Sequence, residues 1–187
     1  VHAPFYLDPK KRKVSAISSL ISHDLWEILA KKKNLPWSEV GTIELAIEEQ
    51  QHKTLEKYLE WGTENGIPEG QLELLDSKEL TKKEPNLKAY SGLFCKRDVS
   101  TDYGIFTKEL HKESEKNGTK FLFNHHVKDI EENSEVKLTF SDNSTLVSKF
   151  IINCSGGNSL DIAKKFGLAL QYNDLHFRGE YWIADKK

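Results

Sequence analysis

The 187-residue sequence predicts an α+β fold, on three observations. Apolar residues recur at helical spacing in several stretches, most clearly over residues 14–29. Short runs with apolar residues at alternate positions indicate antiparallel strands, and Val136, Leu138 and Phe140 are the clearest case. One continuous apolar run, residues 150–152, enters a helix through small residues and is typical of a strand buried on both faces.

Helices and strands alternate in the first half of the chain. The helix that carries the apolar residues 14–29 ends in three lysines, where the helix dipole favours cations. The letters EVGTIELAI predict a strand that bends at Gly41, and residues 48–65 predict a helix that stops at Gly66. A short strand is expected in the letters GLFC.

Capping residues predict where the other helices begin. Asp76 with Glu79 resembles a capping box, and Pro85 ends the short helix that it opens. Asp102 caps a further helix, on which Tyr103, Phe106 and Leu110 share a face. The later strands are expected in the letters KFLFN, HVKDI, the hairpin that turns at SDNS, and FRGEYWIA.

Composition restricts the classes of partner. The net charge of −2 argues against nucleic acid, and no apolar run is long enough to predict a transmembrane helix. The basic residues 10–13 suit either a solvated turn or polyanion binding. Cys95 and Cys154 lie in apolar stretches, which predicts two buried free thiols, a reducing compartment and a cytoplasmic location. No Cys/His spacing of the zinc type is present, so no metal site is predicted.

Few residues carry a chemical signal by themselves. The turn at Cys154, Ser155 and Gly156 suits close approach of a phosphate-bearing cofactor, although similar turns occur in folds that bind nothing. Arg178 beside aromatic residues can meet a carboxylate or phosphate, with an ion pair to Glu180 as the alternative. The alternative for His2 is a solvated terminus, and the alternative for His125 and His126 is a strand edge. No three-glycine dinucleotide fingerprint follows a strand.

Seven stretches, in order, resemble successive motifs of one known family. They are HAPFYLDPKKRK, VGTIELAIEEQQ, LLDSKELTKKEPNL, DVSTDYGIFTKEL, NHHVKDI, INCSGGNSLDIA and FRGEYW. Each is weakly specific, whereas the ordered set spans essentially the whole chain. The family is the flavin-dependent L-2-hydroxyglutarate dehydrogenases and oxidases, within the superfamily of D-amino-acid oxidases and FAD-dependent glycerol-3-phosphate dehydrogenases. The sequence departs from the family at Thr42, where a lysine is usual, and before Asp102.

The resemblance implies a domain organisation. Residues 1–36 and 98–170 are expected to form part of a Rossmann-like FAD-binding domain, and residues 37–97 and 171–187 part of a substrate (cap) domain with an antiparallel sheet. The glycine-rich unit for the FAD pyrophosphate is expected before Val1. The chain is therefore interpreted as an internal fragment, inactive alone and able to self-associate through its exposed surface. Peripheral membrane association of the parent protein is left open.

The resemblance also implies roles for individual residues. Those expected near FAD are His2, Lys13, Val127, Cys154, Ser155 and Gly156. Those expected at the substrate are Arg178 and Tyr181, and His2 is the candidate catalytic base.

Three functions follow from this resemblance and its alternatives. The first is oxidation of a 2-hydroxy acid similar to L-2-hydroxyglutarate by hydride transfer to flavin. The second, in the same superfamily, is oxidation of glycerol 3-phosphate or an amino acid. The third, of a different class, is a non-catalytic α+β binding module.

Overall fold

The computed structural model describes residues 1–182, which contain helices and antiparallel sheets as the sequence predicts. The chain divides into two compact units, Val1–Thr119 and Lys120–Lys187. Among the described residues, no helix has the length and apolar character that a membrane crossing requires. The predicted FAD-binding and substrate ranges follow a different division. They stay a prediction, because compactness alone does not identify which cofactor or substrate a segment contacts.

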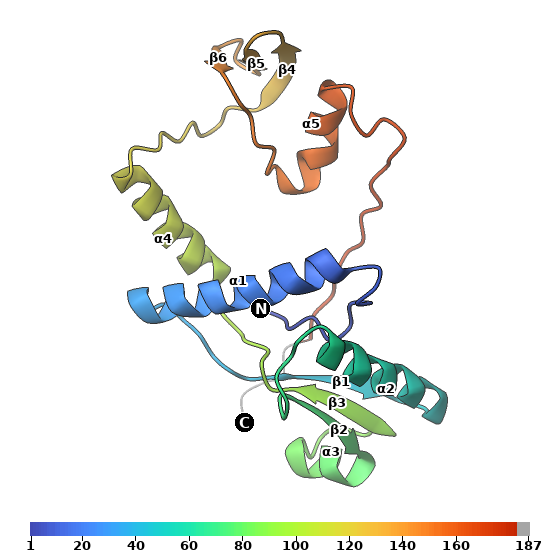
Figure 1. Cartoon of the computed structure of the whole chain (residues 1–187). Coiled ribbons are helices and arrows are strands. Elements are labelled where there is room, and N and C mark those ends of the chain that lie inside the picture. The colour runs from blue at the N-terminus through green and yellow to red at the C-terminus, as the bar shows by residue number, and fades with distance from the viewer. Residues whose placement is uncertain (183–187) are drawn as a thin grey trace. The chain divides into compact units, whose positions relative to one another are not determined.

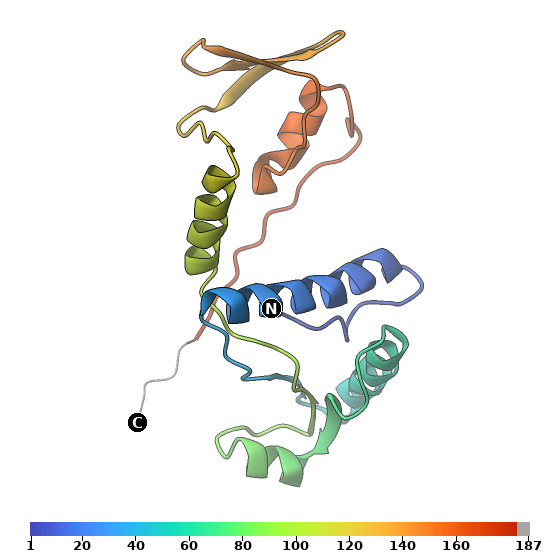
Figure 2. The same cartoon turned by 60° about the vertical axis from the view of Figure 1, so that its left-hand side comes forward.

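The first unit contains four helices and one three-stranded sheet among its described residues. Along the chain the elements are α1 (Lys13–Lys33), β1 (Thr42–Ala46), α2 (Glu49–Glu64), β2 (Leu72–Asp76), α3 (Ser77–Lys83), β3 (Ser91–Cys95) and α4 (Tyr103–Lys116). The sheet is antiparallel with the order β1-β3-β2, so β3 is central. Gly92 of β3 pairs with Leu45 on one side and Leu75 on the other. Helix α2 packs against all three strands, as the views in Figures 1 and 2 show.

The core of the first unit joins the sheet, α2 and the N-terminal segment. Its buried members are Ala3, Phe5, Ala46, Leu55, Ile67, Leu93 and Cys95. Gly62 on α2 permits this packing, because a Cβ atom there would lie 2.3 Å from Cδ1 of Leu72. Burial of these apolar side chains is the main stabilising contribution. The N-terminal segment is thereby fixed against the sheet.

Local polar contacts set the helix starts that the sequence predicts. The Asp76 carboxylate accepts hydrogen bonds from the backbone N–H groups of Lys78 and Glu79, both at 2.8 Å. Glu79 returns the contact by accepting from the Asp76 N–H at 2.9 Å, which completes the capping box. Asp102 accepts from the Ile105 N–H at 3.1 Å and begins α4. The capping box and the Asp102 cap are both confirmed.

Helix α1 is confirmed, but it does not bury its apolar stripe. Its buried residues are Ala16, His23 and Ala30. The stripe residues Val14, Ile17, Ile21, Leu25 and Ile28 are between 46% and 79% exposed. On the buried side, Trp26 packs edge to face on Phe106 of α4, with ring centroids 5.3 Å apart. Of the predicted apolar face of α4, Phe106 is buried whereas Tyr103 and Leu110 are exposed.

The second unit contains a small antiparallel sheet and a short helix among its described residues. The strands β4 (Val127–Glu132), β5 (Val136–Phe140) and β6 (Thr145–Ser148) pair in chain order, which confirms the predicted hairpin. The 3-10 turn η1 (Gly156–Asn158) leads into α5 (Ser159–Lys165). Ile130, Val136 and Phe140 are buried.

Three predicted strands of the second unit are wrong over the described residues. Residues 120–124 form no strand, and the rings of Phe121 and Phe123 stack on each other with centroids 6.0 Å apart. Residues 150–152 form no strand either, and Phe150 and Ile152 are 85% and 86% exposed. A strand buried on both faces requires paired neighbours, and the sheet ends at Ser148, with no partner strand for 150–152 among residues 1–182.

Two further predictions are wrong, namely the last strand over the described residues and the burial of one thiol. Residues 177–182 are not a strand, and the end of the letters FRGEYWIA, residues 183–184, lies outside the described residues. Both cysteines are free thiols, as predicted. Cys95 is buried, but Cys154 is exposed because the segment before it does not enter a sheet.

Candidate functional site

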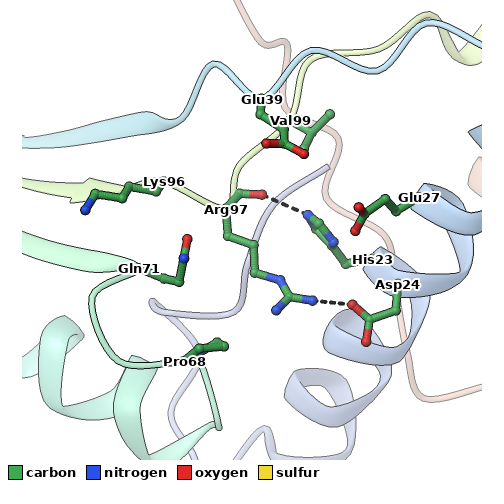
Figure 3. A pocket seen from close by; sticks show the side chains of 9 residues that line it. All are labelled: His23, Asp24, Glu27, Glu39, Pro68, Gln71, Lys96, Arg97 and Val99. Carbon is green, nitrogen blue, oxygen red and sulfur yellow. Dashed lines mark hydrogen bonds and ion pairs between the residues drawn. The ribbon is translucent and has the colours of Figure 1, made fainter. Parts of the chain in front are cut away.

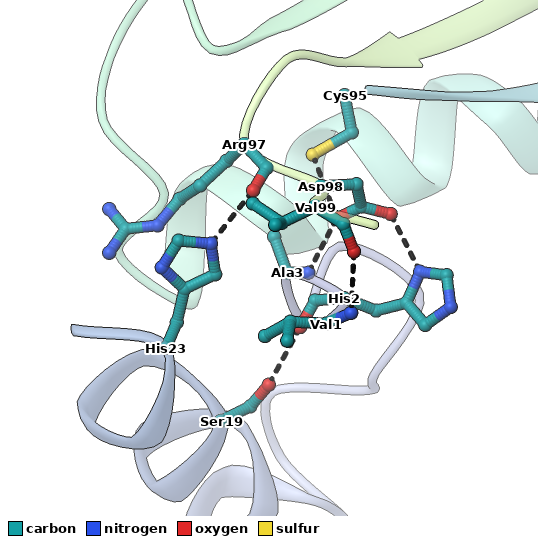
Figure 4. A network of polar contacts seen from close by, with 9 residues as sticks. All are labelled: Val1, His2, Ala3, Ser19, His23, Cys95, Arg97, Asp98 and Val99. Atoms are coloured by element: carbon teal, nitrogen blue, oxygen red, sulfur yellow. Dashed lines mark hydrogen bonds and ion pairs between the residues drawn. The ribbon is translucent and has the colours of Figure 1, made fainter. Parts of the chain in front are cut away.

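Polar side chains gather where α1 lies beside the loop that follows β3. One group lines a cavity and includes His23, Asp24 and Arg97 (Figure 3). The other surrounds Asp98 and contains His2 (Figure 4). Both groups belong to the first unit, and the sequence analysis proposed only His2 among these residues.

His2 is held by a buried carboxylate. Nδ1 of His2 lies 2.7 Å from Oδ2 of Asp98, whose side chain is 2% exposed while that of His2 is 63% exposed. Oδ1 of Asp98 accepts the Ala3 N–H at 2.7 Å and the Cys95 thiol at 3.6 Å. Asp98 therefore has partners for both oxygens, as a buried charge requires. Figure 4 shows these partners converging on it from the N-terminal segment and from β3.

Backbone hydrogen bonds fix the loop that carries Asp98. The Val99 N–H donates to the carbonyl of Val1 at 3.0 Å, and the Gly41 N–H donates to the carbonyl of Asp98 at 2.9 Å. Ser38 and Ser100 form an isolated antiparallel bridge beside these contacts. Three segments distant in sequence thus place the His2 ring and the Asp98 carboxylate together.

This pairing makes His2 able to accept a proton. An ionised carboxylate only accepts hydrogen bonds, so Nδ1 of His2 carries the donated proton. In the neutral imidazole Nε2 is then unprotonated and is the basic atom. A histidine oriented by a buried carboxylate is the arrangement found in many general bases. The exposed ring of His2 can thus act on a molecule outside the core.

Cys95 does not take part as a nucleophile. Burial, followed by the nearby Asp98 carboxylate, raises the pKa of the Cys95 thiol to about 12. The reactive form of cysteine is the thiolate, which is scarce at neutral pH when the pKa is so high. Cys95 is a core residue that donates to Asp98.

The other residues implied to contact FAD lie at exposed or half-buried positions. Lys13 is the first residue of α1 and borders a surface hollow with Pro9 and Ile17. Val127 begins β4 and pairs with Phe140 of β5. These two positions belong to different units, so the structure does not test whether they contact one ligand.

The turn at Cys154, Ser155 and Gly156 is exposed and open. The side chain of Asn153 accepts the Ser155 N–H at 3.2 Å and the Ser155 hydroxyl at 2.8 Å. Gly156 has a φ of 58°, a conformation that favours glycine, and a Cβ at Gly157 would meet no atom within 4 Å. The backbone at Gly157 is therefore open to solvent.

The residues implied to contact the substrate are exposed. They belong to the second unit, whereas His2 belongs to the first. The side chain of Arg178 is 88% exposed, and its Nε lies 3.8 Å from Oε1 of Glu180. Tyr181 is 91% exposed. Two partners were considered for Arg178, a substrate anion and Glu180. The structure shows the ion pair with Glu180. Its role toward a substrate stays a prediction.

Asp98 is the residue that the sequence analysis missed. It is separated from His2 by 96 positions, and no spacing rule joins them. The available signal was an acid between Arg97 and Val99, three positions after the apolar strand that ends at Cys95. An acid expected to be buried there needs a partner, and His2 supplies one.

A comparison with protein families places the chain in a class of protein. The model of the FAD dependent oxidoreductase (DAO) family matches residues 1–187, and the chain belongs to that family.

Comparison with individual proteins adds two relatives. The chain is 26% identical over 193 residues to a glycerol 3-phosphate dehydrogenase of Caloramator mitchellensis, covering 100% of the chain and 38% of that protein. It is 26% identical over 191 residues to a mitochondrial L-2-hydroxyglutarate dehydrogenase of Caenorhabditis briggsae, covering 98% of the chain and 43% of that protein. The chain thus spans roughly two fifths of the length of these relatives.

Solved structures share the fold. The L-α-glycerophosphate oxidase of Mycoplasma pneumoniae, solved with FAD bound, aligns with a TM-score of 0.78 at 21% identity, over 87% of this chain and 44% of its own. Glycine oxidase from Geobacillus kaustophilus aligns with a TM-score of 0.72 at 20% identity, over 83% of this chain and 43% of its own. The family model confirms the expected superfamily, and these solved structures confirm the expected fold class.

Two of the places where the resemblance implies FAD contacts are accessible, each within its own unit. The turn at Gly156 and Gly157 is open and leaves its backbone accessible. His2 presents an exposed imidazole in a fixed orientation. Both features are accessible to a bound molecule.

Proposed function

We propose that the protein containing this chain oxidises the hydroxyl-bearing carbon of a 2-hydroxy acid similar to L-2-hydroxyglutarate. The observation that carries the proposal is the His2–Asp98 pair, in which a buried carboxylate orients an exposed imidazole. FAD, when bound, supplies the acceptor for the hydride. Nε2 of His2 takes the hydroxyl proton, because Nδ1 is already protonated toward Asp98.

The remaining residues bind and position. Lys13, Val127 and the turn at 154–156 are the candidates that hold FAD, and the open glycine turn supports this assignment. Arg178 is proposed to leave Glu180 and pair with the substrate carboxylate, with Tyr181 beside it. A guanidinium suits this task because it meets a carboxylate through two parallel hydrogen bonds.

A second candidate substrate is glycerol 3-phosphate. It is favoured by the relative from Caloramator mitchellensis, whose identity to this chain equals that of the L-2-hydroxyglutarate dehydrogenase. Arg178 meets a phosphate as readily as a carboxylate, so this residue does not separate the two substrates. The proton acceptor would be His2 in both cases.

The first experiment determines the mass and visible absorbance of the native polypeptide that contains this segment. We expect a yellow protein whose flavin is bleached by L-2-hydroxyglutarate under anaerobic conditions. Bleaching by glycerol 3-phosphate, or by an amino acid, would instead assign the second candidate or an amino-acid oxidase. A colourless native polypeptide of the 21.5 kDa of this chain would overturn the proposal and favour a binding module.

Variants of that flavoprotein then test His2. His2→Gln retains a group able to donate to Asp98 but removes the base, so the flavin reduction rate should fall by about a hundredfold or more. Asp98→Asn should also lower the flavin reduction rate, because an amide can donate to Nδ1 and favour the tautomer in which Nε2 already carries a proton. The matched control is His126→Gln, at an exposed position in the second unit. Equal rates in His2→Gln and the control would remove His2 from the reaction.

A further inference from the structure

A cavity of about 300 Å³ lies between α1 and the loop after β3. Figure 3 shows His23, Asp24 and Glu27 projecting from α1 on one side and Arg97 approaching from the loop. Glu39 completes the acidic lining. None of these residues belongs to the His2–Asp98 pair, and no role in the proposed oxidation uses them.

Three potential metal ligands meet at this cavity. His23, Asp24 and Glu27 each offer a ligand atom, and these atoms lie within 4.8 Å of one another. Their spacing explains the meeting, because residues three and four apart face the same side of a helix. Two ligands of one ion, each about 2.0–2.1 Å from it, lie about 3–4 Å apart. A bound ion would draw these atoms closer together.

His23 already has the tautomer of a metal ligand. It is 4% exposed, and its Nε2 lies 2.8 Å from the carbonyl oxygen of Arg97. A carbonyl only accepts, so Nε2 carries the proton and Nδ1 has a lone pair. Metal-binding histidines donate their other N–H to a carbonyl or carboxylate in this way.

The lone pair of His23 is buried without a hydrogen-bond partner. Nδ1 has no hydrogen bond within the described part of the chain. Leaving a buried polar atom unpaired costs about 1–3 kcal/mol, and such atoms are rare in native proteins. This observation is independent of the acidic cluster and indicates a ligand for Nδ1.

The carboxylates of Asp24 and Glu27 each have a basic partner, as metal-binding carboxylates commonly do. Asp24 pairs with the Arg97 guanidinium and Glu27 with Lys31, in each case through one oxygen, so the second oxygen is available. Ligating carboxylates commonly have such outer partners.

We propose that His23, Asp24 and Glu27 bind a first-row divalent transition-metal ion such as Zn²⁺. Nδ1 of His23 and one oxygen from each carboxylate are the ligands, and water fills the remaining position. The imidazole selects against Mg²⁺ and Ca²⁺, which prefer oxygen ligands. The site is separate from the proposed oxidation.

The test is a titration of the metal-stripped full chain with Zn²⁺, followed by calorimetry, and with Co²⁺, followed by visible absorbance. We expect one ion per chain and a Co²⁺ spectrum that Zn²⁺ abolishes by competition, because Zn²⁺ has the same ligand preference. Failure to bind Zn²⁺ at millimolar concentration would overturn the proposal. The surrounding groups would then be an ordinary network of ion pairs.

Variants locate the bound ion. Glu27→Gln and Asp24→Asn remove one ligand each at partly exposed positions, and each should weaken Zn²⁺ binding at least about tenfold. The matched control is Glu115→Gln on α4, which removes the carboxylate of another histidine–glutamate pair four residues apart. It should leave Zn²⁺ binding unchanged. Equal weakening by the control, or none by the two ligand variants, would place the ion elsewhere and overturn the assignment.

Discussion

Residues 1–119 and residues 120–182 follow the same spacing rules but bury their apolar side chains differently. In the first unit, Leu55 of α2 and Leu93 of β3 belong to the core and are 2% and 0% exposed. In the second unit, Phe150 and Ile152 come from an equally apolar run and are 85% and 86% exposed. The difference teaches that an apolar pattern predicts burial only where a packing partner is present.

Helix α1 shows that this rule does not depend on the unit. It belongs to the first unit, yet the side chains of its apolar stripe are largely exposed, Val14 to 79%. The helix forms because its spacing and its final lysines favour it locally. Its stripe stays largely exposed within the first unit. Secondary structure and burial are therefore separate predictions, and the first is the safer one.

The largest expected contrast between the units is in thiol reactivity. Iodoacetamide should modify exposed Cys154 rapidly, and Cys95 slower by about a thousandfold or more, because Cys95 reacts only when the core opens. The raised pKa adds to this protection, since the Cys95 thiol stays protonated as the pH rises from 7 toward 12. Mass spectrometry of peptides after timed alkylation measures both rates. Comparable rates at pH 7 would show that β3 is not buried in solution.

Truncation of matched leucines gives the next largest contrast. Leu93→Ala removes a fully buried side chain from the central strand and should lower the free energy of unfolding by about 2–5 kcal/mol. Leu175→Ala, at a position 80% exposed, should change it by less than about 0.5 kcal/mol. Urea unfolding followed by circular dichroism measures both. A large loss for Leu175→Ala would mean that the exposed residues of the second unit are covered in solution.

The sequence was sufficient for features determined by neighbouring residues. The capping box of Asp76 and Glu79 spans four positions, and the helix start at Asp102 spans four. Both are confirmed because their hydrogen bonds form within the segment that encodes them. The strand expected at residues 150–152 failed because it requires pairing with strands elsewhere.

The candidate sites were less predictable for the same reason. His2 was proposed only through resemblance, and its partner Asp98 lies 96 positions away. The contact of His23 with the Arg97 carbonyl spans 74 positions. No periodicity or spacing rule relates residues at such distances. The tertiary fold brings them together. The sequence therefore pointed to His2 but not to Asp98, the carboxylate that orients its ring.

Helix capping provides the smallest contrast and tests whether the two units differ in local stability as well. Asp76 caps α3 with two hydrogen bonds, whereas the side chain of Asn158, at the corresponding position of α5, makes no capping hydrogen bond. Asp76→Ala should therefore cost about 0.5–2 kcal/mol of unfolding free energy, and Asn158→Ala less than about 0.5 kcal/mol. Urea unfolding measures both, with Asp76→Asn as the control that retains an acceptor. Equal losses for the two alanine variants would mean that α5 is capped in solution, and the contrast between the units would then concern tertiary burial alone.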